Sequence, residues 1–148
     1  TYLEDDTAPL GDDILITGVD LDQDFYRKAL YQKPPDMERG YLRKKLGPAG
    51  EPGDRFRILL AHSPLYFVAY ADWGADLTLS GHFHGGTIRI PGLGGVMTPQ
   101  YQFFLPWCAG DFERDGKRMI VSRGLGTHSI NIRLNNRPQL VLIRLRRA

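Results

Sequence analysis

The sequence predicts a mixed α/β fold, and one stretch near its middle carries most of that prediction. Phe56–Ala61 and Asp76–Ser80 are short apolar runs typical of strands, and Pro64–Trp73 between them has the pattern of a helix. A connection of this kind is typical of a parallel strand–helix–strand unit rather than of a hairpin. Towards the C-terminus the pattern becomes richer in strands. The length of 148 residues is that of a single domain.

The N-terminal third holds one clear strand and a long, poorly patterned stretch. Ile14–Gly18 is an apolar run that ends in glycine, which predicts a buried strand. Apolar residues recur at roughly helical spacing over 21–31, which predicts a short helix. From 31 to 54 the chain is rich in proline, glycine and alternating charge. We expect an exposed excursion there, with one helical turn around Met37–Lys45.

The second half predicts strands separated by a long loop. Thr87–Ile90 is a strand candidate, and 91–116 is a glycine- and aromatic-rich loop. The aromatic side chains of this loop, Phe103 and Phe104 among them, either pack on the sheet or cover a nearby site as an apolar lid. The three remaining strands are predicted at Met119–Arg123, Ile130–Leu134 and Gln139–Arg146.

Composition excludes several classes of protein. The 19 Lys+Arg and 17 Asp+Glu give a formal charge of +2, and the hydrophobic fraction of 42% is ordinary for a globular chain rather than a disordered one. No apolar run approaches the roughly 20 residues that span a bilayer. The single cysteine, Cys108, cannot form an intrachain disulfide. After Asp115 the charges are all basic, but they alternate with Leu and Ile, which favours the solvated face of a strand over a nucleic-acid site.

Three histidines follow the two strands of the central unit. His62 comes directly after the first strand, and His82 and His84 follow the second within Gly81-His82-Phe83-His84-Gly85-Gly86. Ligand sites collect at strand ends in α/β sheets. Alternate side chains of an extended segment point to one side, so we expect His82 and His84 to share a site while Phe83 packs away. Neutral imidazoles ligate Zn, Mn and Fe-class ions, so the three residues predict a partial metal site.

Four strings carry a more specific signal. They are Ala61-His62-Ser63-Pro64, Asp76-Leu77-Thr78-Leu79-Ser80-Gly81-His82-Phe83-His84-Gly85-Gly86, Ser122-Arg123-Gly124-Leu125-Gly126 and Asn136-Arg137-Pro138. These strings resemble the calcineurin-like metallophosphoesterases, and more narrowly a bacterial branch whose members often carry membrane anchors or export signals. The resemblance implies a four-layer α/β/β/α sandwich of which this chain forms the C-terminal half.

The resemblance also implies a chemistry and a role for each histidine. Two divalent ions of the Mn, Fe or Zn class would be bound, one by His62 and His82 and the other by His84. Such a binuclear centre hydrolyses phosphomonoesters or phosphodiesters by generating a hydroxide nucleophile and by neutralising the charge that develops on the phosphoryl oxygens.

The other motifs of that family do not occur in this sequence. The family pattern needs Asp-x-His, Gly-Asp-x-x-Asp and Gly-Asn-His-Asp/Glu upstream of His62. The sequence has no Asp-x-His and no Gly-Asn pair, and Leu15 stands where the second carboxylate after Gly11-Asp12 belongs. Neutral imidazoles alone do not offset the repulsion of two divalent ions about 3.5–4 Å apart. With the start at Thr1, this predicts a fragment that is inactive alone, its catalytic residues lying in a missing N-terminal half.

Two alternatives and one consequence accompany this hypothesis. The three histidines could serve a metal-binding or interaction module without catalysis, or a mononuclear three-His zinc hydrolase with an open fourth position. As half of a sandwich, the chain would leave one sheet face uncovered. We therefore expect association through that face, either with the missing half or with a second copy.

Overall fold

The computed structural model describes residues 2–26, 35–51, 53–97, 103, 106–126 and 132–146. It has a six-stranded sheet in the order β1-β2-β3-β4-β8-β7 and a separate β5-β6 pair, so the predicted mixed α/β class is confirmed. The strands are β1 (Asp6–Leu10), β2 (Ile14–Val19), β3 (Phe56–Ala61), β4 (Leu77–Ser80), β5 (Ile88–Ile90), β6 (Gly94–Met97), β7 (Gly110–Arg114) and β8 (Lys117–Val121). The helices are α1 (Tyr41–Leu46), α2 (Phe67–Trp73) and the 3₁₀ turns η1 (Gln23–Tyr26) and η2 (Pro64–Tyr66).

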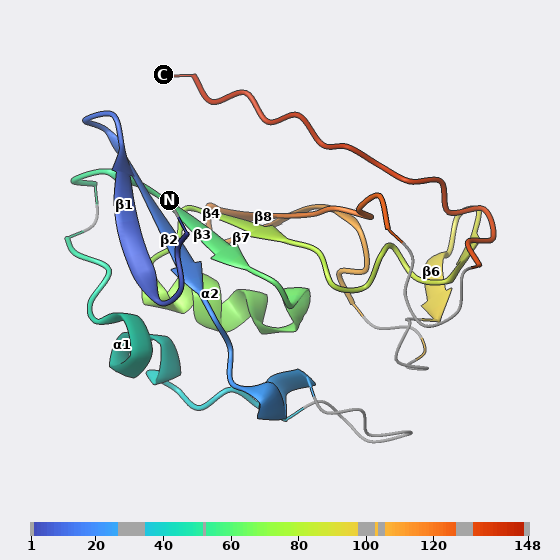
Figure 1. Cartoon of the computed structure of the whole chain (residues 1–148), viewed down its shortest axis with the longest axis horizontal. Coiled ribbons are helices and arrows are strands. Elements are labelled where there is room, and N and C mark those ends of the chain that lie inside the picture. Colours follow the sequence, from blue (N-terminus) through green and yellow to red (C-terminus); the bar gives the residue numbers. More distant parts are fainter. Residues whose placement is uncertain are drawn as a thin grey trace.

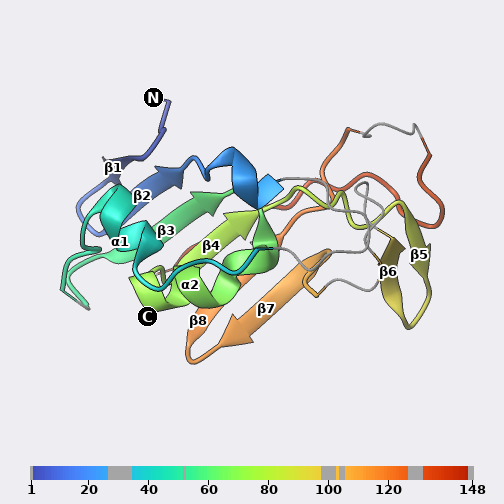
Figure 2. The same ribbon diagram turned by 90° about the horizontal axis from the view of Figure 1, so that it is seen from below.

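Parallel pairing dominates the centre of the sheet. Strands β2, β3, β4 and β8 run parallel, whereas β1 and β7 pair antiparallel with their neighbours at the two edges. Helices α1 and α2 lie on one face of the sheet, and the C-terminal segment passes over the other (Figure 1). Seen from below, both helices lie across the strands, and the β5-β6 pair lies beyond one end of the sheet (Figure 2).

The central unit folds as its sequence predicts. The hydroxyl of Ser63 accepts a hydrogen bond from the backbone N–H of Leu65, and Pro64 occupies the first turn, where a missing N–H costs nothing. Gly74 ends α2 at φ 119°, a left-handed conformation that glycine adopts without strain, and its N–H bonds back to the last turn. This connection returns the chain so that β4 pairs parallel with β3.

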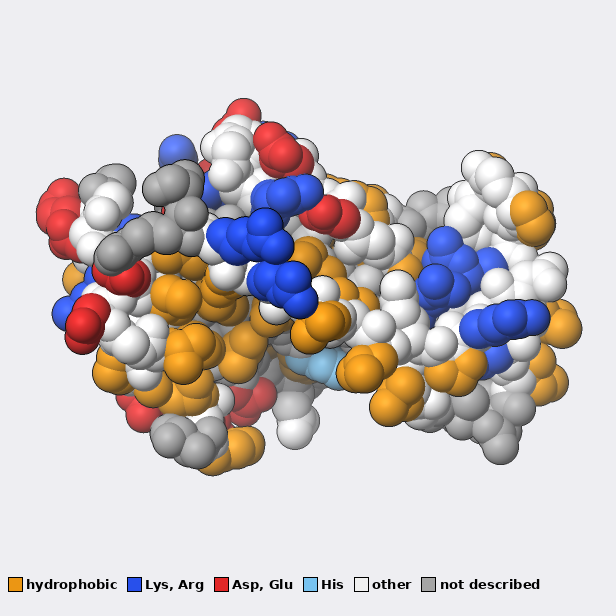
Figure 3. Space-filling view, turned by 90° about the horizontal axis from the view of Figure 1, so that it is seen from above, with side chains coloured by type: hydrophobic (Ala, Val, Ile, Leu, Met, Phe, Trp, Pro, Cys, Tyr) orange, Lys and Arg blue, Asp and Glu red, His pale blue; other side chains and the backbone are white. Residues whose placement is uncertain are grey.

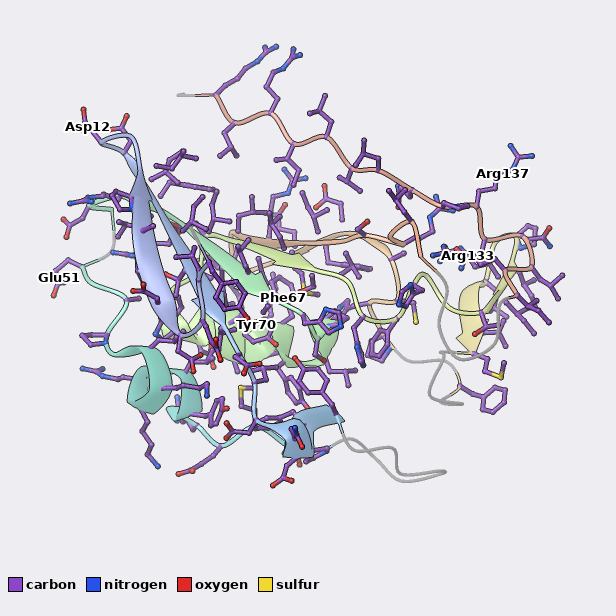
Figure 4. All side chains as sticks on the ribbon, in the orientation of Figure 1. Asp12, Glu51, Phe67, Tyr70, Arg133 and Arg137 are labelled. Carbon is purple, nitrogen blue, oxygen red and sulfur yellow. The ribbon has the colours of Figure 1, made fainter. Side chains whose placement is uncertain are left out.

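The core lies between the sheet and the helices. Alternate residues of β3, including Leu59 at 0% exposure, point towards α2. Tyr70 is also fully buried, and its hydroxyl donates to the carbonyl oxygen of Ser63 over 2.8 Å. Phe67 packs in a second cluster with Met119 of β8. Figure 4 labels Phe67 and Tyr70, two of the aromatic residues of α2, on the helix side of the sheet. The aromatic side of α2 therefore fixes this helix to the strands that precede the histidines.

The stretch 31–54 is exposed only in part, which corrects the sequence-based expectation. The predicted helical turn forms as α1, and its Leu42 is 2% exposed and joins the core cluster of β3 and α2. The Nζ atom of Lys45 lies 2.9 Å from Asp5 Oδ2 and 3.2 Å from Asp22 Oδ1, which ties α1 to the start of the chain. Residues 27–34, on which part of the predicted 21–31 helix falls, lie outside the described residues.

The stretch 91–116 is not one loop, because it contains β6 and β7. Strand β7 forms a hairpin with β8 through Asp115 and Gly116, which adopt φ 51° and 74°. Positive φ at both turn residues is the requirement of the tight hairpin turn that Asp-Gly favours. The Asp115-Gly116 dipeptide is therefore the sequence signal from which this hairpin could have been predicted. Strand β7 was not predicted because its sequence is mostly polar, and an edge strand needs few apolar residues.

The predicted strand Gln139–Arg146 is also wrong in the described structure. The segment forms no ladder with a described residue, and Leu140 and Leu142 are 85% and 86% exposed. Of the predicted strand Ile130–Leu134, residues 130 and 131 lie outside the described residues, and Leu134 forms an isolated parallel bridge with Ile88. Alternating apolar residues predict an extended segment, but they do not determine whether a neighbouring strand pairs with it.

The sheet face opposite the helices carries partly exposed apolar side chains. The register places Gly18, Leu60, Leu79 and Ile120 in one row across four strands, and Leu60 is 38% exposed. Phe56, on the same side of β3, is 40% exposed. Figure 3 shows hydrophobic side chains gathered on this side, with basic side chains in front of them. Parallel sheets usually bury both faces. On this side Ile58 and Leu77 are buried while Phe56 and Leu60 are partly exposed, so this apolar surface, the open sheet face, is covered only in part.

None of the helices in the described ranges is long and apolar enough to cross a membrane.

Replacing Leu42 with alanine tests whether α1 is part of the core. We expect Leu42→Ala to lower the free energy of unfolding by about 2–5 kcal/mol, because it removes a buried side chain from a packed cluster. Urea denaturation followed by circular dichroism measures this change. The exposed neighbour Arg43→Ala is the control and should stay within about 0.5 kcal/mol. Equal small effects of both variants would contradict the buried role of α1.

Candidate metal centre

His62 and His82 come together because they follow neighbouring parallel strands. The register pairs Leu60 of β3 with Leu79 of β4, so both strands end at the same edge of the sheet. The N–H of Gly81 donates to the carbonyl oxygen of His62 over 3.2 Å, which continues the pairing past the strands. The two imidazole rings are 4.8 Å apart between centroids and meet edge to face at 73°.

The backbone of 82–84 is not extended, which corrects the premise that placed His82 and His84 on one side. Both residues adopt positive φ, 61° and 49°. Between them Phe83 is fully buried, as predicted, and its N–H donates to the carbonyl oxygen of Gly81 over 2.7 Å. A left-handed conformation costs a non-glycine residue roughly 1–2 kcal/mol, and such strain collects at functional sites. The strain therefore marks this turn as a candidate site.

His84 is held by a contact of its own. Its Nδ1 lies 3.1 Å from the carbonyl oxygen of Gly126. Because a carbonyl only accepts, Nδ1 carries the hydrogen, and the lone pair is left on Nε2. Ligating histidines are oriented by this kind of second contact.

Burial controls the protonation state of the residues around this edge. Burial lowers the pKa of His62, and repulsion from the nearby His84 ring in its protonated form lowers it further. A lowered pKa keeps the imidazole neutral at neutral pH, as a metal ligand must be. Tyr26 lies beside both rings of the pair, at centroid distances of 5.3 Å to His82 and 6.0 Å to His62.

Tyr26 is a residue that sequence reasoning did not place at the site. Burial, and then the charge of Asp20, raise its pKa to about 12, so the phenol remains protonated at neutral pH and can donate a hydrogen bond. It ends η1, far from the histidines in the sequence, and no motif surrounds it. Only the fold brings it to the edge of β3 and β4.

Three curated proteins are similar to this chain over about 60% of its length. The chain is 33% identical over 91 residues to the uncharacterized metallophosphoesterase YkuE of Bacillus subtilis, which is 62% of the chain and 31% of that protein. It is 31% identical over 85 residues to the uncharacterized metallophosphoesterase YkoQ of Bacillus subtilis, covering 57% and 32%. It is 33% identical over 89 residues to the phosphodiesterase YaeI of Escherichia coli, covering 60% and 32%.

This chain is a distant homologue of metallophosphoesterases. The resemblance of its motifs to that family is thereby confirmed. The matched region spans about a third of the length of each relative. No family model and no solved structure matches the chain.

A metallophosphoesterase implies divalent metal, and the histidines fit part of such a centre. The paired, edge-to-face rings of His62 and His82 suit two ligands of one ion. Within the described residues, however, no three His, Cys, Asp or Glu side chains are placed to hold an ion together. The structure thus places His62 beside His82 and gives His84 a separate contact. It does not bring the three together, as a mononuclear three-His zinc site would require.

Two roles were open for the aromatic residues between β6 and β7: packing on the sheet, or covering a nearby site as an apolar lid. Trp107 packs edge to face on Phe67 of α2, at a centroid distance of 5.8 Å, so it is a packing residue. Phe103 is 50% exposed and forms an isolated bridge with Met97. Phe104 lies outside the described residues.

Gly85 allows the chain to pass close beneath the C-terminal segment. It has φ 76°, and a Cβ atom on it would lie 2.5 Å from Arg123 Cγ and 2.6 Å from Asn136 Oδ1. Gly81, on the other side of the histidines, would meet nothing within 4 Å and lacks a positive φ. The two glycines therefore differ in what an added methyl group encounters.

This difference makes Gly81→Ala a matched control for Gly85→Ala. We expect Gly85→Ala to lower the free energy of unfolding by more than about 1 kcal/mol, from the left-handed backbone alone, with the close contacts adding to it. Gly81→Ala should leave stability unchanged or slightly raised. Chemical denaturation of both variants measures the difference. Similar losses in both would show that the turn is not packed as described.

Proposed function

We propose that this chain supplies the histidine ligands of a binuclear metal-dependent phosphoesterase that hydrolyses phosphomonoesters or phosphodiesters. His62 and His82 bind one divalent ion of the Mn, Fe or Zn class, and His84 binds the other. The observation that carries the proposal is the ring pair of His62 and His82 at the carboxyl ends of adjacent parallel strands, in a homologue of metallophosphoesterases. The name of one relative, a phosphodiesterase, supports the phosphoester class.

Each side chain of the edge has a task in this proposal. Metal ions held there supply Lewis-acid activation of water and of phosphoryl oxygens. His62 binds as the neutral imidazole, because burial lowers its pKa. His84 presents Nε2, because Gly126 engages Nδ1. The protonated phenol of Tyr26 stays a hydrogen-bond donor beside the pair.

We further propose that the chain alone does not hydrolyse phosphoesters. The sequence lacks the family's carboxylate motifs, and the described residues hold no three-ligand group. A binuclear centre needs anionic ligands to offset the repulsion of its ions. We infer that the chain forms the C-terminal half of a four-layer α/β/β/α sandwich, whose other half brings the carboxylates and the catalytic residues. The coverage of about a third of each relative supports this inference.

The same proposal assigns an occupant to the open sheet face. A second sheet, from the other half or from a second copy, would cover the row that contains Leu60 and Leu79. The partial exposure of Leu60 and Phe56 supports this assignment. Burying such a row is favourable at roughly 25 cal/mol per Å² of apolar surface.

Metal binding without turnover is the expected behaviour of the purified chain. We expect His62→Ala and His82→Ala each to weaken Zn²⁺ binding roughly tenfold or more, because each removes one ligand of an ion. Isothermal titration calorimetry measures the affinity. His128→Ala, the fourth histidine, which has no role in the proposal, is the control.

With Mn²⁺ added, the chain should not hydrolyse bis(p-nitrophenyl) phosphate. Turnover that disappears in His62→Ala would overturn the inactive-half interpretation, and binding without turnover in the full-length protein would favour a non-catalytic metal module.

Association through the open sheet face should be visible in solution. We expect the purified chain to have a mass above that of a monomer by light scattering, and Leu60→Glu to shift it towards the monomer by placing a charge on the apolar row. Leu93→Glu is the control, because Leu93 is 60% exposed in the turn between β5 and β6, away from that row. A clean monomer with no co-purifying fragment would count against the covered face.

A further inference from the structure

Asn136 is a buried polar residue in an otherwise exposed part of the chain. It is 2% exposed, whereas Leu134 is 54% exposed and Arg137 is exposed. Its Nδ2 donates to the carbonyl oxygen of His84 over 2.7 Å and also to that of Gly86. One side-chain amide therefore joins two carbonyls of the histidine turn from 50 residues away in the sequence. Burying an amide is unfavourable unless its hydrogen bonds are made, and the two contacts satisfy Nδ2, whereas Oδ1 is buried with no hydrogen-bond partner among the described residues.

The turn that Asn136 contacts has an unusual backbone. His84, Gly85 and Gly86 have φ of 49°, 76° and 83°, three left-handed residues in succession. The carbonyl oxygens of all three accept from side chains: those of His84 and Gly86 from Asn136, and that of Gly85 from Arg89 Nη1 over 2.9 Å. The first of these residues is not a glycine, so its conformation has to be held by its surroundings. Asn136 provides the two contacts that bracket the turn.

A second residue of the same segment, Arg133, contacts the carbonyl group to which the His84 ring is hydrogen-bonded. Arg133 Nη2 donates to the carbonyl oxygens of Arg123 over 3.0 Å and Gly124 over 3.4 Å, and also to that of Gly126. The Gly126 oxygen also accepts from Nδ1 of His84. Arg133 therefore fixes the acceptor that sets the tautomer and direction of the His84 ring. Figure 4 shows Arg133 between the turn and the C-terminal segment, while Arg137 points away from both.

We propose that Asn136 is a positioning residue for His84, assisted by Arg133. Asn136 holds the backbone of the turn in its left-handed form, and Arg133 holds the carbonyl that orients the ring, so that Nε2 is presented away from Gly126. The importance of this role for metal rests on the proposed function, in which His84 is a ligand. The conformational role does not depend on metal. It gives the string Asn136-Arg137-Pro138 a physical task.

The test uses the whole 148-residue chain, labelled uniformly with ¹⁵N, without metal. Long-range ¹H–¹⁵N spectra distinguish a ring protonated on Nδ1 from one protonated on Nε2. We expect His84 of the unchanged chain to be the Nδ1–H form. Asn136→Asp keeps the shape but replaces the donor with an acceptor, and Asn136→Ala removes the amide without adding charge. In both variants the His84 signal should move to a mixture of tautomers while the signals of the sheet persist. Arg137→Ala should change neither.

Zn²⁺ affinity is the second measurement. Contacts that orient a ligand typically change metal affinity roughly 10–100-fold, so we expect a loss of that size in both Asn136 variants and none in Arg137→Ala. Folded variants with an unchanged His84 tautomer and unchanged affinity would overturn the proposal. Variants that both unfold would also overturn it, because a positioning role leaves the sheet intact. If the unchanged chain does not bind Zn²⁺, the proposed function fails, and the tautomer measurement still decides the role of Asn136.

Discussion

Strand β4 is hydrogen-bonded in parallel to β3 on one side and to β8 on the other, and the candidate site depends on this arrangement. The two parallel pairings bring three chain segments to one edge of the sheet: the segment after β3 with His62, the one after β4 with His82, and the one after β8 with Gly126. Helix α2 makes the first pairing possible by returning the chain between the strands. Its buried Tyr70 bonds to Ser63, directly after His62, so core packing and site geometry are set by the same contact.

The sequence predicts this central part well because each of its signals is local. The apolar runs of β3 and β4, the proline at Pro64 and the stop at Gly74 all act within a few residues of where they stand. The contacts of Tyr26 and Asn136 could not be predicted in this way. Both reach the site from distant parts of the chain through the fold, and a single tyrosine or asparagine has no pattern around it. The left-handed turn at His82 and His84 also escaped prediction, because tertiary contacts rather than local propensity hold it.

The electrostatics of the edge explain why its histidines require further ligands for a binuclear centre. Burial favours the neutral form of His62, which suits coordination but contributes no negative charge. Two divalent ions a few ångströms apart repel each other strongly at low dielectric, and imidazole does not screen that repulsion. The Tyr26 phenol does not help either, since its raised pKa keeps it uncharged. The described edge thus offers neutral ligands, and in the proposed binuclear centre the anionic ligands would come from carboxylates outside this group.

The C-terminal segment contacts the histidine turn and also passes over the open sheet face. Up to Gln139 it is anchored: Asn136 and Arg133 bond to the histidine turn and its neighbours, and the N–H of Gln139 donates to the carbonyl oxygen of Gly124 over 3.0 Å. Beyond Gln139 the described segment forms no ladder, although its residues alternate as in a strand. An extended segment with exposed Leu140 and Leu142 and no ladder to a described residue favours pairing with another strand. Because the anchored part holds His84, a partner that pairs with the extended part would also stabilise the conformation of this proposed ligand. Under the proposed function, covering the apolar surface and completing the metal centre would then be one event rather than two.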